Sequence, residues 1–263
     1  MSSEQNKVIL RAEHISKTYG EKKVLEDISI HLEQGELVSL LGVSGSGKTT
    51  LFNMLSGIIP PDEGKVYLKD QDVTSTPGSI SYMLQKDLLL PHKKVIDNVA
   101  LPLVLKGVKK AEAREKANPL FAEFGLEGTQ YQYPSQLSGG MRQRAALLRT
   151  YLSSSGVALL DEPFSALDTL TKASVHKWYL EVMQHIDLST LFITHDIDEA
   201  ILLADRIVVM EPGKIRSILQ VELPHPRKRD DLIGTQGYEK LHRKLIASFY
   251  EQVQDNIDAG VAL

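Results

Sequence analysis

The sequence of 263 residues contains no cysteine. This absence excludes disulfide bonds, thiolate metal sites and a cysteine nucleophile. The chain also has no uninterrupted apolar stretch near the roughly 20 residues that span a bilayer, and residues 1–7 lack the apolar region of a signal peptide. We therefore expect a cytoplasmic chain that serves a membrane, if it does so, only through a partner.

The chain has no large excess of charge of either sign. It carries 30 Lys and Arg against 34 Asp and Glu, whereas proteins that neutralise phosphate backbones are basic. Nucleic acid is therefore not an expected partner. With 42% apolar residues, 18 glycines and 11 prolines, the composition excludes a disordered or fibrous protein. The length fits one large domain or a core with a smaller insertion.

Hydrophobic patterning predicts an α/β protein. Short apolar runs predict strands at 8–12, 28–32, 37–41, 65–68, 80–83, 157–160, 191–194 and 207–210. Helical patterns occur at 48–56, 95–105, 110–124, 140–152, 169–185 and 197–204. Nearly all-apolar strands alternating with helices predict a parallel sheet covered on both faces, and the helical run over 86–155 predicts an inserted subdomain. A linker over 224–231 precedes a last amphipathic helix, which places Leu241, Leu245, Phe249 and Val253 on one face.

The strongest motif is a glycine-rich loop between an apolar strand and a helix. Residues 42–49 match G-x-x-x-x-G-K-S/T, the pattern of a P-loop. Its glycines let backbone N–H groups surround a phosphate chain at the positive end of a helix, Lys48 meets the β and γ phosphates, and the Thr49 hydroxyl is a Mg²⁺ ligand. The alternative is an ordinary glycine-rich turn. The candidate phosphate-binding residues are Gly42, Ser44, Gly45, Ser46, Gly47, Lys48, Thr49 and Thr50.

A P-loop needs a carboxylate strand, and residues 157–163 supply one with Asp161 and Glu162 at its end. Because the chain turns there, Asp161 can face the metal while Glu162 faces the attacking water. The alternative is that both carboxylates only cap the next helix.

A second candidate phosphate site lies at residues 137–144. Ser138 can cap a helix, and Gly139 and Gly140 leave N–H groups open to an anion at its start. A plain helix cap after a turn is the alternative.

Together these motifs resemble the nucleotide-binding subunits of ABC transporters over about residues 8–221. Residues 137–144 resemble the signature motif, Asp161 and Glu162 the Walker B aspartate and catalytic glutamate, and residues 165–168 the D-loop. The resemblance implies that Gln85 is the Q-loop glutamine, His195 the switch histidine and Tyr19 the aromatic that stacks on adenine. It thereby implies ATP and Mg²⁺ as cofactors, catalytic roles for Glu162, His195, Lys48 and Gln85, and Thr49, Gln85 and Asp161 as metal ligands.

The same resemblance implies a fold and its boundaries. We expect a P-loop NTPase core with a mainly parallel sheet and an N-terminal antiparallel β subdomain over 1–85 and 156–223. An inserted α-helical subdomain would occupy 86–155, and 224–263 would form the linker and last helix. The pattern departs from the family at Met141, which replaces a common glutamine, and at Ser155-Gly156, which lacks a common proline.

Four of these residues have simpler structural interpretations. Tyr19 could be a half-buried residue at a strand end, Gln85 a surface side chain, and His195 a structural histidine beside Asp196. Asp168 could cap the helix that starts at residue 169, and it could also serve both roles.

In this family two copies would close head to tail around two ATP molecules. Ser138, Gly139 and Gly140 would contact the γ-phosphate of the partner's ATP, while Glu162 polarises water and His195 stabilises the transferred phosphoryl group. Residues 89–92, 98–103 and 164–171 resemble the nitrate, sulfonate, taurine and thiamine-precursor importer group. The expected partners are a second copy, integral membrane permease subunits and, indirectly, an extracytoplasmic solute-binding protein. The chain would then sit peripherally on the cytoplasmic face of the membrane.

Two other functions compete with an importer subunit: a soluble ABC-type ATPase not coupled to transport, and a P-loop small-molecule kinase. The second phosphate site at Ser138 argues against the kinase. The run Leu88-Leu89-Leu90 after Gln85 predicts either an apolar surface that a permease helix covers or leucines that pack beneath the helical insert.

Overall fold

The computed structural model describes residues 7–224, 227 and 229–258. Parts of two predicted segments lie outside these described residues, namely the start of the first domain and part of the 224–231 linker. The side chain of Val253, expected on the apolar face of the last helix, also falls outside them.

The N-terminal part forms a four-stranded antiparallel sheet in the order β2-β1-β4-β5. Its strands are β1 (Val8–Tyr19), β2 (Lys22–Glu33), β4 (Glu63–Leu68) and β5 (Gln71–Asp72). The prediction made β1 and β2 much too short. Their register shifts between Ala12 and Ile15, and this shift interrupts the alternation of apolar and polar residues by which a strand is recognised in the sequence. His14 and Asp27, each at φ 53°, form this irregularity and their side chains pair at 2.7 Å.

The central sheet has six strands in the order β10-β9-β3-β8-β7-β6, and all neighbours are parallel except β10 against β9. The strands are β3 (Leu37–Gly42), β6 (Ser81–Met83), β7 (Val157–Asp161), β8 (Ser189–Thr194), β9 (Arg206–Glu211) and β10 (Lys214–Gln220). The predicted mainly parallel sheet and antiparallel subdomain are thus confirmed. Strand β10 was not predicted because its residues are mostly exposed or half-buried at the sheet edge.

Alternating side chains of the central strands divide the interior into two cores. On β3, Val38 and Leu40 face the antiparallel sheet and α1 (Lys48–Leu55), whereas Leu37 and Leu41 face the remaining helices. Both faces of the sheet are therefore covered, as all-apolar parallel strands require.

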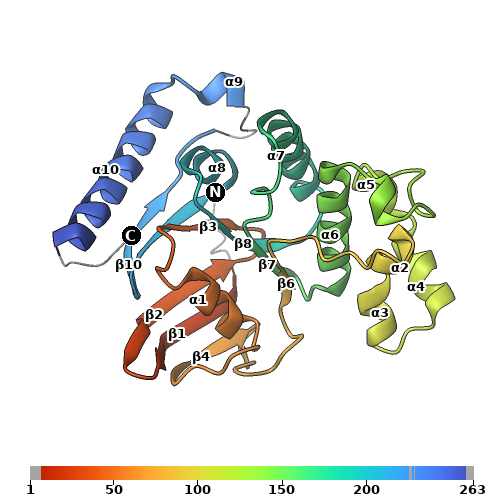
Figure 1. Cartoon of the computed structure of the whole chain (residues 1–263), viewed down its shortest axis with the longest axis horizontal. Helices are drawn as coiled ribbons and strands as arrows, with labels where there is room; N and C mark the ends of the chain where they lie inside the picture. Colours follow the sequence, from red (N-terminus) through yellow and green to blue (C-terminus); the bar gives the residue numbers. More distant parts are fainter. Residues whose placement is uncertain (1–6, 225–226, 228, 259–263) are drawn as a thin grey trace.

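Figure 1 shows the helices between β6 and β7 gathered on the side of the molecule opposite α10. They are α2 (Val95–Val99), α3 (Leu101–Leu105), α4 (Lys110–Ala117), α5 (Leu120–Glu123), the 3₁₀ turn η1 (Pro134–Gln136) and α6 (Gly139–Ser153). The predicted helices over 95–105 and 110–124 are each broken, because Pro102 and Pro119 have no N–H to continue the hydrogen-bond ladder.

Four helices follow β7 among the residues that the structure describes. They are α7 (Thr169–Met183), α8 (Ile197–Leu203), α9 (Arg229–Leu232) and α10 (Gln236–Asp258). The expected linker therefore contains a short helix, α9, which corrects that prediction. Within the described ranges no helix is long and apolar enough to cross a membrane.

Candidate functional site: a P-loop and a separate serine-glycine helix start

The glycine-rich loop connects β3 to α1 in the geometry of a phosphate cradle. Gly45 and Gly47 stand at φ 80° and 99°, in the left-handed region that side chains disfavour. A Cβ on Gly42 would lie 2.6 Å from the Met210 carbonyl oxygen, so β9 leaves no room for a side chain there. No side chain caps the first turn of α1, which leaves its backbone N–H groups directed at the loop.

Lys48 folds back onto this loop. Its ammonium group lies 2.8 Å from the carbonyl oxygens of Gly42 and Val43 and 3.3 Å from Ser46 Oγ. Burial lowers the pKa of Lys48, and the charges of Glu162 and Asp161 oppose that shift. Oxygen atoms of the loop thus accept hydrogen bonds from the Lys48 ammonium group, and phosphate oxygens could replace them as acceptors.

Two adjacent carboxylates end β7 and point to different partners. Asp161 is 9% exposed and accepts from the Tyr82 hydroxyl at 3.2 Å. Burial raises the pKa of Asp161. Glu162 stands at φ 45°, and its N–H donates to the Ile193 carbonyl at 3.1 Å. This strained turn separates the directions of the two side chains, as the sequence predicted.

Two of the other predicted site residues contact the Glu162 carboxylate. Gln85 Nε2 donates to its carboxylate at 3.0 Å and also lies 3.3 Å from Ser165 Oγ. His195 Nδ1 lies 3.3 Å from the other oxygen of Glu162, and its side chain is 63% exposed. Gln85 is an exposed side chain, as its simpler interpretation predicted, and its amide is bonded to Glu162. His195, interpreted alternatively as a structural histidine beside Asp196, contacts Glu162.

The oxygen donors beside the P-loop fit a hard divalent cation. Thr49 is close enough to Asp161 to lower the pKa of that carboxyl, and a carboxylate with a hydroxyl is a donor set that Mg²⁺ accepts together with phosphate oxygens and water. Gln85, the third predicted ligand, directs its amide nitrogen at Glu162, which leaves its oxygen as the ligating atom.

Tyr19 and Thr50 lie at the margin of this site. Tyr19 is the last residue of β1 and is 47% exposed, with the Lys17 ammonium 5.6 Å from its ring centre. Its position at the strand end and its 47% exposure agree with the half-buried interpretation, and they also leave part of the side chain accessible to a ligand. Thr50 is half-buried in the first turn of α1.

The second glycine-rich helix start lies apart from the first. Ser138 caps α6 and accepts from the Met141 N–H at 3.2 Å, while Gly139 and Gly140 open the helix. A Cβ on Gly140 would lie 3.1 Å from Thr171 Cγ2, so this glycine also permits close packing of α6 on α7. Figure 1 shows α6 and α1 well separated in the fold.

Asp168 caps α7, accepting from the Thr171 N–H at 3.1 Å, as its structural interpretation predicted.

Gly156 explains the missing proline before β7, because its φ of 97° is closed to proline.

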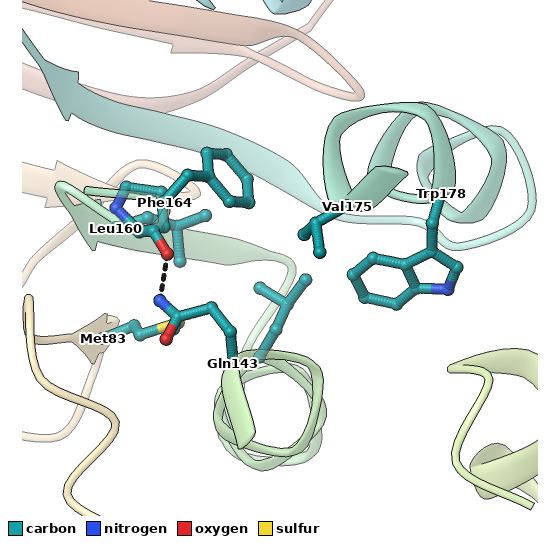
Figure 2. Close-up of a pocket in the computed structure, with 8 residues that line it drawn as sticks. Met83, Gln143, Leu160, Phe164, Val175 and Trp178 are labelled. Carbon is teal, nitrogen blue, oxygen red and sulfur yellow. Dashed lines mark hydrogen bonds between the residues drawn. The ribbon is translucent and has the colours of Figure 1, made fainter. Parts of the chain in front are cut away.

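Helix α6 is hydrogen-bonded directly to the loop that follows Asp161 and Glu162. Figure 2 shows Gln143 reaching from α6 toward this loop, where its amide donates to the Pro163 carbonyl. The cavity around it, which Met83 and Val175 help to line, has a volume of only about 10 Å³ and therefore cannot hold a ligand.

Sequence reasoning missed a buried network behind His195. Glu199 is 3% exposed, lies 2.7 Å from His176 Nε2 and accepts from the Thr194 hydroxyl. Asp196 caps α8 by accepting from the Glu199 N–H at 3.1 Å. The Asp-x-x-Glu spacing is a capping signal that could have located this turn, whereas nothing local in the sequence indicates the pairing with His176.

Comparison with known proteins agrees with this geometry. Residues 25–165 match the ABC transporter family. A formylaminopyrimidine import ATP-binding protein of Halalkalibacterium halodurans is 42% identical over 85% of this chain and 88% of its own. A taurine import ATP-binding protein of Escherichia coli O157:H7 is 39% identical over 84% and 86%. The solved dimeric ABC transporter cassette MJ0796 superimposes with a TM-score of 0.70 at 27% identity, over 82% of this chain and 100% of that one. This chain belongs to the ABC transporter family.

Proposed function

We propose that this chain is the ATP-hydrolysing subunit of an ABC importer and that two copies close head to tail around two ATP molecules. One observation carries the proposal: the chain holds two glycine-rich helix starts, at α1 and α6, that lie apart (Figure 1) and that we propose bind phosphate. Each half-site needs its complement from a second copy. The import ATP-binding relatives favour an importer over a soluble ABC-type ATPase, and the second helix start argues against a small-molecule kinase.

ATP would bind first through the P-loop. The amides around Gly45 and Gly47 would hold the phosphates, Lys48 would leave its carbonyl partners for the β and γ oxygens, and Tyr19 would stack on adenine. Thr49, Asp161 and Gln85 would hold Mg²⁺, which when bound neutralises phosphate charge.

Hydrolysis would depend on Glu162. Its carboxylate, oriented by Gln85 and His195, accepts a proton from the attacking water. His195 stabilises charge on the transferred phosphoryl group, and Ser138 with Gly139 and Gly140 of the second copy does so from the other side. Turnover would therefore require closure of the pair.

The Glu162→Gln variant tests the proposed base. The amide keeps the shape and one accepting oxygen but cannot accept a proton, so phosphate release should fall about 100-fold or more while ATP binding persists. Steady-state phosphate release and ATP-dependent dimerisation, followed by size-exclusion chromatography, measure the two effects. Glu112→Gln, at an exposed position on α4, is the matched control. Turnover of Glu162→Gln within a few-fold of the unchanged chain would remove Glu162 from this role.

We further propose that the segment after Gln85 is where a membrane permease subunit docks. Of the three consecutive leucines, Leu88 is 52% exposed, whereas Leu89 is 7% exposed and belongs to the core. Leu89 thus packs beneath the insert, and an aspartate there would damage folding rather than docking. Leu88 stands at φ 45°, and Arg149 donates to its carbonyl oxygen at 2.9 Å, which holds the exposed side chain outward.

The docking proposal predicts that Leu88→Asp folds and hydrolyses ATP normally but no longer assembles with permease subunits. Ile58→Asp, at a 56% exposed position after α1, is the matched control and should assemble. Hydrogen exchange of residues 86–95 should slow in the full complex. Unchanged exchange, or normal assembly of Leu88→Asp, would eliminate this surface.

In this proposal the chain would lie peripherally on the cytoplasmic face of a membrane, with the helical subdomain of residues 86–155 toward the permease. A solute-binding protein outside the cell would act on the chain only through that permease.

A further inference from the structure

The C-terminal segment packs against the helix that follows the switch histidine. Leu232, Tyr238 and Leu245 are 6%, 3% and 0% exposed, and they join the core to which α8 belongs. Figure 1 shows the resulting position of α10, at the flank of the molecule away from the helical insert.

Three side chains of this segment converge on Asp198, in the first turn of α8. The Tyr238 hydroxyl donates to Asp198 Oδ1, the Arg229 guanidinium lies 3.2 Å from Oδ2, and His242 Nε2 lies 3.5 Å from Oδ1. The rings of Tyr238 and His242 stack with centroids 5.8 Å apart. Burial and the Asp198 charge raise the pKa of Tyr238, so its hydroxyl remains a donor.

The same turn is also held from its buried side. Glu199, the next residue, is fixed by His176 and Thr194, and Asp196 caps the turn. His195 directly precedes this turn, and its side chain is 63% exposed. Little packing holds the imidazole, so the backbone of the turn sets its distance from Glu162.

We propose that Tyr238 and Arg229 are positioning residues for ATP hydrolysis, which act through Asp198 to hold the first turn of α8 and thereby fix His195 against Glu162. The proposal rests on the role proposed above for His195. It assigns the C-terminal helix a part in turnover that neither the P-loop nor the signature motif supplies. The contrasting interpretation is that α10 only covers apolar surface on α8, in which case it would affect stability alone.

The kinetics of the full chain separate these interpretations. Tyr238→Phe removes one hydroxyl, and we expect kcat to fall about three- to tenfold with KM for ATP within about twofold, because the P-loop is untouched. Tyr250→Phe makes the same chemical change at a 74% exposed position on the same helix and should leave kcat unchanged. Asp198→Asn, a second variant that weakens both contacts, should lower kcat in the same way.

The deciding measurement combines Tyr238→Phe with His195→Ala in a double-mutant cycle, assayed by single-turnover hydrolysis. If Tyr238 acts through His195, the double variant should hydrolyse ATP as His195→Ala does, with no further loss. Multiplying losses would overturn the proposal.

The melting temperatures and the kcat values of the single variants are equally decisive. A lower melting temperature with unchanged kcat, in both Tyr238→Phe and Asp198→Asn, would show a structural role only. An unchanged kcat in His195→Ala would overturn the proposed role of His195 and this inference with it. An impaired His195→Ala beside a normal Tyr238→Phe and Asp198→Asn would overturn this inference alone.

Discussion

The chain contains two glycine-rich helix starts that differ in how the backbone N–H groups of the first turn are capped. At α1 the residue before the helix is Gly47, at φ 99°, and no side chain caps the first turn. At α6 the residue before the helix is Ser138, in extended conformation, and its hydroxyl caps the Met141 N–H. The first start depends on left-handed glycine geometry, and the second begins as an ordinary capped helix.

This difference indicates which half-site changes when nucleotide arrives. Lys48 is bound to carbonyl oxygens of its own loop, and under the proposed function it would exchange them for phosphate oxygens. Ser138 can keep the Met141 N–H as its donor while its own hydrogen remains available to a phosphate oxygen. In the proposed mechanism the P-loop would therefore reorganise around ATP, whereas α6 would meet the ligand already formed.

Mixing two inactive variants tests whether the two starts belong to one shared site. Lys48→Ala removes the phosphate ligand of the first, and Ser138→Arg blocks the second with a long side chain. We expect each variant alone to lose about 100-fold or more in ATP hydrolysis. In an equal mixture roughly a quarter of the sites should be intact, because half of the dimers are mixed and each has one complete site.

Phosphate release from the mixture, compared with each variant at the same total concentration, measures the recovery. Absent recovery together with normal ATP-driven dimerisation of Ser138→Arg would break the shared-site comparison.

Much of the fold was predictable because its signals are local. The apolar runs that became β3, β7, β8 and β9 are buried on both faces, and the P-loop follows one of them, so strand, loop and helix agreed with the motif. The capping roles of Ser138 and Asp168 were predictable for the same reason, since each lies directly before its helix.

The remaining features depend on residues that meet only in three dimensions. The bulge of His14 and Asp27 pairs positions on two strands, and its positive φ angles carry no glycine signal. The contact of Tyr238 with Asp198 joins residues far apart in sequence. The leucine run was ambiguous because Leu88 and Leu89 are chemically identical, and only the fold turns one outward and the other inward.

A pair of glycine substitutions sharpens the comparison by stability alone. An alanine at Gly47 must adopt φ near 99°, and its Cβ would lie 2.7 Å from Leu25 Cδ2 and 3.0 Å from the Val24 carbonyl oxygen. An alanine at Gly139, in the first turn of α6, would meet Leu167 Cδ2 at an ordinary 3.5 Å and Arg142 Nη2 at 4.0 Å. We expect Gly47→Ala to lower the free energy of unfolding by about 2 kcal/mol or more and Gly139→Ala to change it by less than about 0.5 kcal/mol. Urea denaturation of the nucleotide-free chain measures both, and equal losses would show that the two helix starts are built alike after all.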